Sequence, residues 1–247
     1  MSRAGRCAVL PGERAVEAVL FDLDGTLLDT APDLVGALNV LRVEAGLEAA
    51  PVDEFRPYVS QGALGLIRAG LPACGPQEEA RRRLRFLEWY EAHSLDHTAP
   101  FPGVESMLAR LEEAGVPWAV VTNKPTFLTL PLLDALGWQD RAGAVVCGDT
   151  LSVSKPDPAP VLHACETLGV APARSAMVGD DPRDLDAGEA AGALSILVSF
   201  GYGAASILAS GRALEAVVDS PGAVLDYVPA CREAAAAGSA TPGSAPP

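Results

Sequence analysis

The chain is poor in basic residues. Its 247 residues include 18 lysines and arginines against 32 aspartates and glutamates, which gives a formal net charge of −14. Proteins that bind nucleic acids non-specifically need a basic surface that neutralises phosphates, so this balance of charge argues against a nucleic-acid partner. An anionic small molecule would need local positive charge to bind against the overall negative field.

Cysteine and histidine are too scattered to predict a zinc site or a disulfide framework. The five cysteines show no CxxC spacing, and the three histidines share no ligand spacing with one another. Free thiols in a reducing compartment are the expected state of the cysteines. We expect core or surface roles for the histidines rather than catalytic ones.

The sequence also lacks a long apolar run. No segment approaches the roughly 20 apolar residues that cross a bilayer. Pro11, Gly12 and Glu13 interrupt the only candidate for the apolar part of a secretion signal. We therefore expect a soluble, cytoplasmic protein without a membrane partner. Hydrophobic residues make up 49% of the chain and charged residues 20%, which is typical of a globular protein.

Short apolar runs alternate with segments of helical period through most of the chain. Strands are expected near residues 17–22, 117–122, 144–147, 174–178 and 194–198. Helices are expected near residues 103–114, 126–136, 158–168 and 182–191. The alternation predicts an α/β fold in which a mostly parallel sheet is covered by helices.

The stretch from about residue 31 to 99 breaks this alternation. It has no convincing strand, and it has four helix-like pieces near residues 33–45, 51–58, 63–70 and 77–93. We interpret it as a helical cap, inserted after the first strand, over the C-terminal edge of the sheet. The predicted domains are a flexible N-terminal extension over 1–15, an α/β core over 16–30 and 100–230, the cap over 31–99 and a disordered tail over 231–247.

Two carboxylates follow the first predicted strand. Asp22 and Asp24 lie in the sequence FDLDGT, and side chains two residues apart on an extended backbone point the same way. Like charges this close repel each other unless a cation or a proton lies between them, so the pair favours a hard ion such as Mg²⁺. A calcium-binding loop is excluded because Leu27 and Asp33 stand where that loop needs Gly and Glu.

Three further polar motifs lie at the ends of predicted strands or in the loops that follow them. Thr122 and Asn123 end the second core strand, Lys155 lies after the third, and Asp180 ends the fourth. Open α/β sheets bind their ligands at the carboxyl ends of the strands. We therefore expect the four motifs to form one site.

Together the four motifs supply what hydrolysis of a phosphate monoester needs. Asp22 would attack phosphorus and form an aspartyl-phosphate. Mg²⁺ would be bound by Asp22, Asp180 and the backbone carbonyl of Asp24. The Asp24 carboxyl group would protonate the leaving oxygen and then deprotonate the attacking water. The phosphoryl oxygens would be bound by Thr122, the backbone of Asn123 and the ammonium group of Lys155.

Several of these residues also have structural explanations. Asp181 and Asp184 fit the N-cap and N3 positions of a helix that starts at Pro182, and Asp184 fits a supporting role beside a metal equally well. Lys155 alone would be an ordinary surface lysine, and Thr122 with its neighbour alone would be a turn. The joint order and placement of the motifs favour the chemical interpretation.

Two features of the predicted cap are less informative. The basic run from Arg81 to Arg85 is expected to be a solvated helix face. The polar link from Ser60 to Ala63 either contacts the substrate or forms a simple turn between helices.

With these four motifs in this order, the chain resembles the phosphatase branch of the haloacid dehalogenase superfamily, in which a helical cap follows the first motif. The resemblance covers residues 18–225. It implies a Rossmann-like core, a mobile cap, Mg²⁺ dependence and the residue roles given above. Dehalogenases of the superfamily typically lack the second aspartate of the first motif, so Asp24 argues for phosphate chemistry.

Within this branch the chain is similar to two groups of phosphatases. The segments 121–125, 154–158 and 201–203 resemble bacterial phosphoglycolate phosphatases. Trp118 and the run 179–181 are closer to N-acetylmuramic acid 6-phosphate phosphatases. We therefore expect a small-molecule phosphate monoester, 2-phosphoglycolate or N-acetylmuramic acid 6-phosphate, as the substrate of a monomer or homodimer. A sugar phosphomutase of the β-phosphoglucomutase kind shares every core motif and stays open as an alternative.

Overall fold

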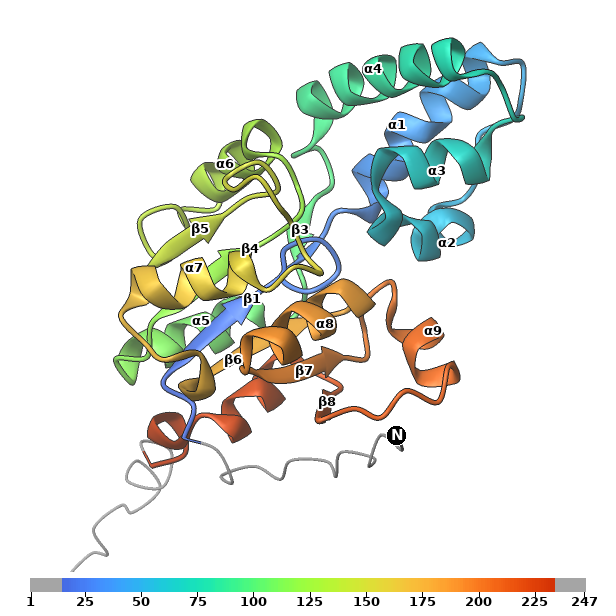
Figure 1. The fold of residues 1–247 in the computed structure, drawn as a ribbon. Helices are drawn as coiled ribbons and strands as arrows, with labels where there is room; N and C mark the ends of the chain where they lie inside the picture. Colours follow the sequence, from blue (N-terminus) through green and yellow to red (C-terminus); the bar gives the residue numbers. More distant parts are fainter. Residues whose placement is uncertain (1–14, 234–247) are drawn as a thin grey trace, which may run out of the picture.

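The computed structural model describes residues 15–233 (Figure 1). The predicted N-terminal extension lies outside the described residues except for Ala15, and the predicted tail lies outside them from residue 234 onward. Residues 231–233, predicted to belong to the tail, are helical, and Cys231 is buried in the largest hydrophobic cluster. The predicted tail therefore starts three residues too early. One cysteine beside an Ala-rich stretch has no periodic pattern that would predict its burial.

A parallel sheet of six strands forms the centre of the molecule. The strands lie in the order β5-β4-β1-β6-β7-β8, and each neighbouring pair is parallel. They are β1 (Ala18–Phe21), β4 (Trp118–Val121), β5 (Ala144–Val146), β6 (Ser175–Gly179), β7 (Leu194–Val198) and β8 (Ala216–Val218). The five predicted strands are confirmed. Strand β8 was not predicted because Glu215 and Asp219 limit its apolar run to three residues.

Helices cover both faces of the sheet, which confirms the predicted α/β class (Figure 1). Successive residues of β1 point to opposite faces: Val19 and Phe21 pack in one hydrophobic cluster with α5, and Leu20 packs in another with α7 and α8. The helices are α5 (Val104–Glu113), α6 (Thr126–Ala135), α7 (Ala159–Leu168), α8 (Pro182–Ala191) and α9 (Ala204–Ala209), with the 3₁₀ turns η2 (Pro172–Arg174) and η3 (Pro221–Tyr227).

A second group of helices, which we call the helical unit, lies beyond the carboxyl ends of the strands (Figure 1). Its members have a hydrophobic cluster of their own, with Val35, Leu38, Leu66 and Phe86 at its centre. They are α1 (Ala31–Glu44), α2 (Val52–Phe55), the 3₁₀ helix η1 (Arg56–Gln61), α3 (Gly62–Gly70) and α4 (Pro76–His93). The second predicted helix is therefore a short α-helix that continues as a 3₁₀ helix.

Two short strands connect the helical unit to the sheet. Strand β2 (Leu28–Asp29) pairs in antiparallel fashion with β3 (Ala99–Pro100). Neither was predicted, because two residues carry no periodic pattern. Among the residues described, no helix is both long and apolar enough to cross a membrane. The four cysteines within the described range are unpaired.

Candidate active site

The polar motifs lie at the carboxyl ends of three adjacent strands. Asp22 follows β1, Thr122 follows β4 and Asp180 follows β6. Because β1 pairs in parallel with both β4 and β6, these three ends lie side by side. Each strand is buried along its whole length, so the sequence changes from core to site within one residue.

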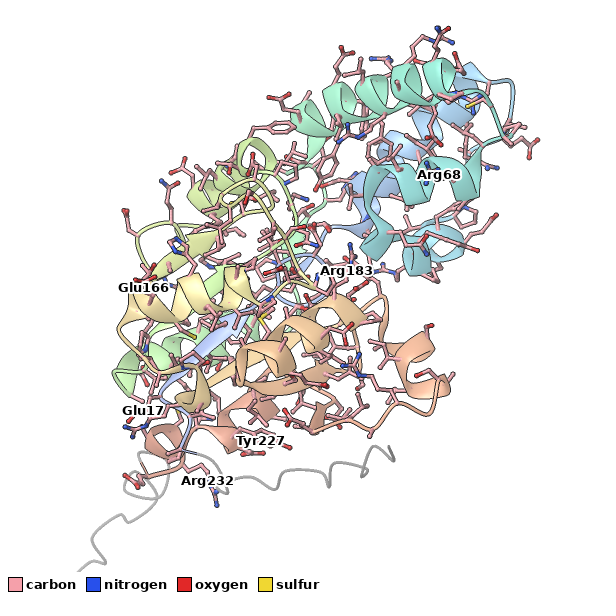
Figure 2. All side chains as sticks on the ribbon, viewed as in Figure 1. Glu17, Arg68, Glu166, Arg183, Tyr227 and Arg232 are labelled. Carbon is pink, nitrogen blue, oxygen red and sulfur yellow. The ribbon has the colours of Figure 1, made fainter. Side chains whose placement is uncertain are left out.

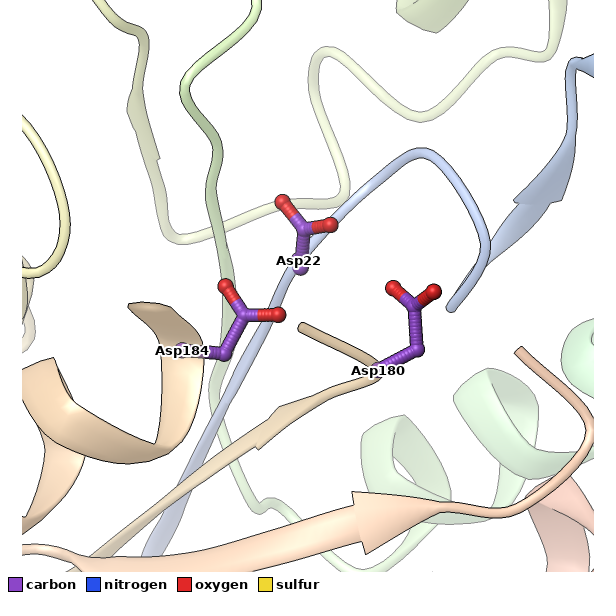
Figure 3. Close-up of side chains that lie close together, drawn as sticks. All are labelled: Asp22, Asp180 and Asp184. Carbon is purple, nitrogen blue, oxygen red and sulfur yellow. The ribbon is translucent and has the colours of Figure 1, made fainter. Parts of the chain in front are cut away.

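Three buried carboxylates converge at this edge. One oxygen atom of each of Asp22, Asp180 and Asp184 lies within 4.8 Å of the others. Figure 3 shows the three side chains directed toward a common region from the ends of β1 and β6 and from the first turn of α8. The Nζ of Lys155 lies 2.8 Å from Oδ1 of Asp22 and 2.6 Å from Oδ1 of Asp184. Three carboxylates and one ammonium group leave a formal excess of two negative charges, which fits a divalent cation.

Burial and mutual repulsion act against the ionised forms of these carboxylates. Burial raises the pKa of Asp22 to about 7, although the charge of Lys155 acts in the opposite direction. Burial, and then the charges of Asp184 and Asp22, raise the pKa of Asp180 well above its ordinary value. A bound divalent cation would relieve this repulsion, so the cluster is suited to one.

Asp184 makes both kinds of contact that were predicted as alternatives. Its Oδ2 accepts a hydrogen bond from the backbone N–H of Asp181 at 3.0 Å, which completes a capping box at the start of α8. Its Oδ1 meets Lys155 within the acidic cluster. The N-cap role of Asp181 is confirmed. One carboxylate oxygen of Asp184 thus caps the helix, and the other contacts the site.

Lys124, which was not among the predicted site residues, binds Asp24. Its Nζ lies 3.1 Å from both carboxylate oxygens of Asp24 and donates a hydrogen bond to the Tyr90 hydroxyl at 2.8 Å. Burial lowers the pKa of Lys124, but the charge of Asp24 and the contact with Tyr90 outweigh burial and raise the pKa above its ordinary value. Lys124 therefore remains an ammonium ion that joins β4 to α4. Its position directly after Thr122 and Asn123 is the feature of the sequence that could have predicted Lys124 as a site residue.

The Asn123 side chain fixes the backbone of Lys155. Its Nδ2 donates to the Lys155 carbonyl at 2.8 Å, and its Oδ1 accepts from the Lys155 N–H at 3.0 Å. The Lys155 ammonium group also donates to the carbonyl of Val121 at 2.5 Å. Thr122 is buried, and its hydroxyl accepts a hydrogen bond from the N–H of Lys124 at 3.1 Å. The second and third motifs are thus one hydrogen-bonded unit.

Two glycines allow the loops around Asp180 to approach it closely. A Cβ atom at Gly25 would lie 2.6 Å from Oδ2 of Asp180, and the φ angle of +87° there favours glycine. A Cβ atom at Gly201 would overlap the Asp180 side chain. The N–H of Gly203 donates to Oδ2 of Asp180 at 3.0 Å. The position of this carboxylate therefore depends on the loops after β1 and β7.

A cavity of about 320 Å³ separates this site from the helical unit. Its core wall is formed by the four polar motifs. Its helical wall is formed by α4, with Arg83, Phe86, Leu87 and Tyr90, and by the link that holds Ser60 and Gln61. The cavity lies between the acidic cluster and the helices, and its volume suits a small molecule.

The polar link of the helical unit contacts the core at this cavity. The Ser60 hydroxyl donates to Oδ2 of Asp180 at 3.4 Å. Arg183 donates to the Ser60 carbonyl and pairs with Asp181 at 2.7 Å. Figure 2 shows Arg183 between α8 and the helical unit. The link therefore belongs to the wall of the site and is more than a turn.

Comparisons with known proteins agree with this geometry. A family model described as haloacid dehalogenase-like hydrolase matches residues 16–192. N-acetylmuramic acid 6-phosphate phosphatase of Pseudomonas aeruginosa is 40% identical over 217 residues, which is 86% of this chain and 95% of the relative. Phosphoglycolate phosphatase of Xanthomonas campestris pv. campestris is 42% identical over 189 residues, which is 76% of this chain and 86% of the relative.

A solved structure shows the same arrangement. The crystal structure described as "a predicted phosphoglycolate phosphatase from haemophilus somnus 129pt" is similar with a TM-score of 0.75 and 27% sequence identity. The similarity covers 87% of this chain and 98% of the solved one. Sheet and helical unit are therefore found together in a protein of nearly the same extent.

Proposed function

Because the chain belongs to the haloacid dehalogenase-like hydrolases, we propose that it is a Mg²⁺-dependent phosphatase of a small-molecule phosphate monoester. The observation that carries this proposal is the buried cluster of Asp22, Asp180 and Asp184, with Lys155 in contact, beside a cavity. The two curated relatives, both named as phosphatases, match most of the chain. A phosphoric monoester hydrolase needs this combination of a carboxylate nucleophile, a metal site and a fixed cation.

Asp22, Asp180 and Asp184 are the residues that would hold the metal, together with the backbone carbonyl of Asp24. Carboxylate and carbonyl oxygens are the ligands that Mg²⁺ prefers, and the excess negative charge of the cluster supports the fit. When bound, Mg²⁺ supplies the positive charge that lets an anionic nucleophile meet an anionic phosphoryl group.

Asp22 is the proposed nucleophile. A carboxylate oxygen of Asp22 forms a bond to phosphorus as the bond from phosphorus to the ester oxygen breaks, which leaves an aspartyl-phosphate on the chain. Asp24 donates a proton to the leaving ester oxygen. It then accepts a proton from the water that attacks the aspartyl-phosphate, so inorganic phosphate is released and both carboxyl groups return to their starting states. Lys124 holds Asp24 at the cavity between these steps.

The phosphoryl oxygens are bound by Thr122, the backbone of Asn123 and Lys155 in this proposal. What supports the role of Lys155 is that its ammonium group is already in contact with the nucleophile. Two hydrogen bonds from Asn123 hold its backbone in place before substrate arrives. Cations and N–H groups that are fixed in advance stabilise the charge of the transition state without reorganisation.

We propose that the helical unit, residues 31–99, acts as a cap. The hydrolase core then consists of residues 16–30 and 100–230. The helical unit's own hydrophobic cluster and its two-strand connection to the sheet support movement as a unit. Closure of such a cap would exclude bulk water while the phosphoryl group is transferred to Asp22. A cytoplasmic location, in keeping with the unpaired cysteines within the described range, is part of the same proposal.

Phosphate release by the whole chain tests the proposal. We expect release from 2-phosphoglycolate or N-acetylmuramic acid 6-phosphate with Mg²⁺, loss of activity in EDTA and recovery when Mg²⁺ is added back. Activity that resists EDTA would contradict the metal assignment. Formation of an isomer of a hexose phosphate without phosphate release would indicate the phosphomutase alternative.

A further inference from the structure

Four basic side chains line the cavity, and three of them already contact carboxylates. Lys155 meets the acidic cluster, Lys124 meets Asp24, and Arg183 meets Asp181. The fourth is Arg83, which is exposed to solvent. Within residues 15–233, Arg83 has neither a hydrogen bond nor an ion pair. The cavity therefore holds one cation whose partner the described part of the chain does not supply.

Arg83 lies on the face of α4 that forms the helical wall. Phe86, Leu87 and Tyr90 follow it at three, four and seven residues, and all of them line the cavity. Residues with this spacing share one side of a helix. Arg83 therefore lies on the same side of α4 as the apolar residues that pack this helix against the rest of the molecule.

The other arginines of the basic run face elsewhere. Arg81 and Arg82 pair with Glu78, and Arg85 pairs with Glu44. All three line a separate depression between α1 and α4. Arg83 is exposed, as predicted for this helix face, but unlike these three arginines it lines the cavity.

The position of Arg83 along α4 places it away from the phosphoryl site. Tyr90 is the point at which α4 contacts Lys124, beside Asp24. Seven residues separate Tyr90 from Arg83, which is a rise of about 10 Å along a helix axis. Figure 1 shows α4 leading away from the sheet toward its N-terminal end. A ligand that contacts both Arg83 and the phosphoryl site must span most of this distance. The arginine side chain can cover the remainder.

We propose that Arg83 binds a carboxylate of the substrate at the end of the cavity remote from the acidic cluster. The proposal rests on the phosphatase function proposed above. A guanidinium group binds a carboxylate through two parallel hydrogen bonds, and the aliphatic part of the side chain packs on the apolar wall. The substrate class is therefore a phosphate ester that carries a carboxylate far from its phosphate.

The size of the site favours an acidic sugar phosphate over a two-carbon acid. In 2-phosphoglycolate three bonds separate phosphorus from the carboxyl carbon, which is roughly 4 Å. That length is short of the separation along α4. The cavity of about 320 Å³ lies at the lower end of the range of pockets for small organic molecules, about 300–1,000 Å³. N-acetylmuramic acid 6-phosphate carries its phosphate on C6 and its carboxylate on the lactyl group at C3, so several ring bonds separate the two groups.

A matched pair of esters tests the proposal. N-acetylglucosamine 6-phosphate lacks the lactyl group, and with it the carboxylate, of N-acetylmuramic acid 6-phosphate. We expect kcat/KM of the wild type to favour the acidic ester. In Arg83→Gln we expect kcat/KM for the acidic ester to fall about ten- to hundredfold, as for the loss of a charge-assisted contact, while the preference for it collapses. Arg83→Lys should retain part of the preference, and Arg81→Gln is the control on the same helix.

The outcomes separate this proposal from the phosphatase function. Equal losses on both esters in Arg83→Gln would show a structural role and overturn the proposal. A preference unchanged by Arg83→Gln, or a wild type that hydrolyses 2-phosphoglycolate but not the acidic sugar ester, would also overturn it. If the wild type with Mg²⁺ releases phosphate from none of these esters, it is the phosphatase function that fails.

Discussion

The two walls of the cavity differ in how their charges are balanced. On the core wall, Lys124 and Lys155 are buried and each contacts carboxylates. On the helical wall, Arg83 is exposed and has no partner in the described range, among the apolar side chains of Phe86 and Leu87. On the core wall the lysines contact carboxylates of the chain itself before substrate arrives. On the helical wall, the proposed partner of Arg83 is a carboxylate of the substrate. We therefore expect the core to carry the chemistry and the helices to select the substrate.

The largest expected effect is on turnover, from a change on the core wall. Asp22→Asn removes the proposed nucleophile but keeps its shape, so we expect kcat to fall at least about 1,000-fold, with the fold intact. Steady-state phosphate release measures the loss, and circular dichroism checks the fold. Asp186→Asn, at a half-exposed aspartate of α8 that pairs with Arg212, is the control. Activity above about one percent of wild type would contradict the nucleophile assignment.

The two walls should also differ in their contribution to stability. Lys155→Met would leave buried carboxylates uncompensated, and we expect the metal-free protein to lose about 3–5 kcal/mol of unfolding free energy. Arg83→Gln should change that free energy by less than about 0.5 kcal/mol, because the side chain is exposed and unpaired within the described range. Urea unfolding in EDTA measures both. Similar losses in the two variants would remove the contrast between the walls.

The acidic cluster predicts the pH dependence of the metal-free protein. Burial raises the pKa of Asp22 to about 7 in the folded state. Between the ordinary pKa of an aspartate and about pH 7, the folded state therefore holds a proton that the unfolded state has released. Stability is therefore greatest below the ordinary pKa of an aspartate. It falls as pH rises through about 7, by up to about 1.4 kcal/mol per pH unit for each such group. Urea unfolding in EDTA across this range should show the fall, and Asp22→Asn should reduce it. Stability that rises with pH would contradict the account.

The smallest effect is expected where the two walls touch. Tyr90→Phe removes the hydroxyl that accepts a hydrogen bond from Lys124, and we expect a loss of about 1 kcal/mol in stability. A double-mutant cycle with Lys124→Met isolates the pair. A coupling free energy of zero would show that this contact does not join the walls.

The sequence predicted the core wall well and the helical wall poorly, for physical reasons. Apolar runs that end in polar residues locate the ends of parallel strands, so Asp22, Thr122 and Asp180 could be placed together. The pairing of Lys124 with Asp24 joins residues 100 positions apart, and no local pattern reveals it. The direction of Arg83 depends on the register of α4 against the rest of the molecule. Among four arginines in five residues, the sequence could not show which one lines the cavity.

Chemical trapping tests whether Asp22 forms a covalent phosphoenzyme. The protein is quenched during turnover with Mg²⁺ and treated with borohydride, which reduces an aspartyl-phosphate to homoserine, and the modified residue is located by peptide mass spectrometry. We expect homoserine at position 22 and unmodified aspartate at position 24, with no homoserine in Asp22→Asn. Reduction at Asp24, or none at either position while phosphate is being released, would contradict this expectation.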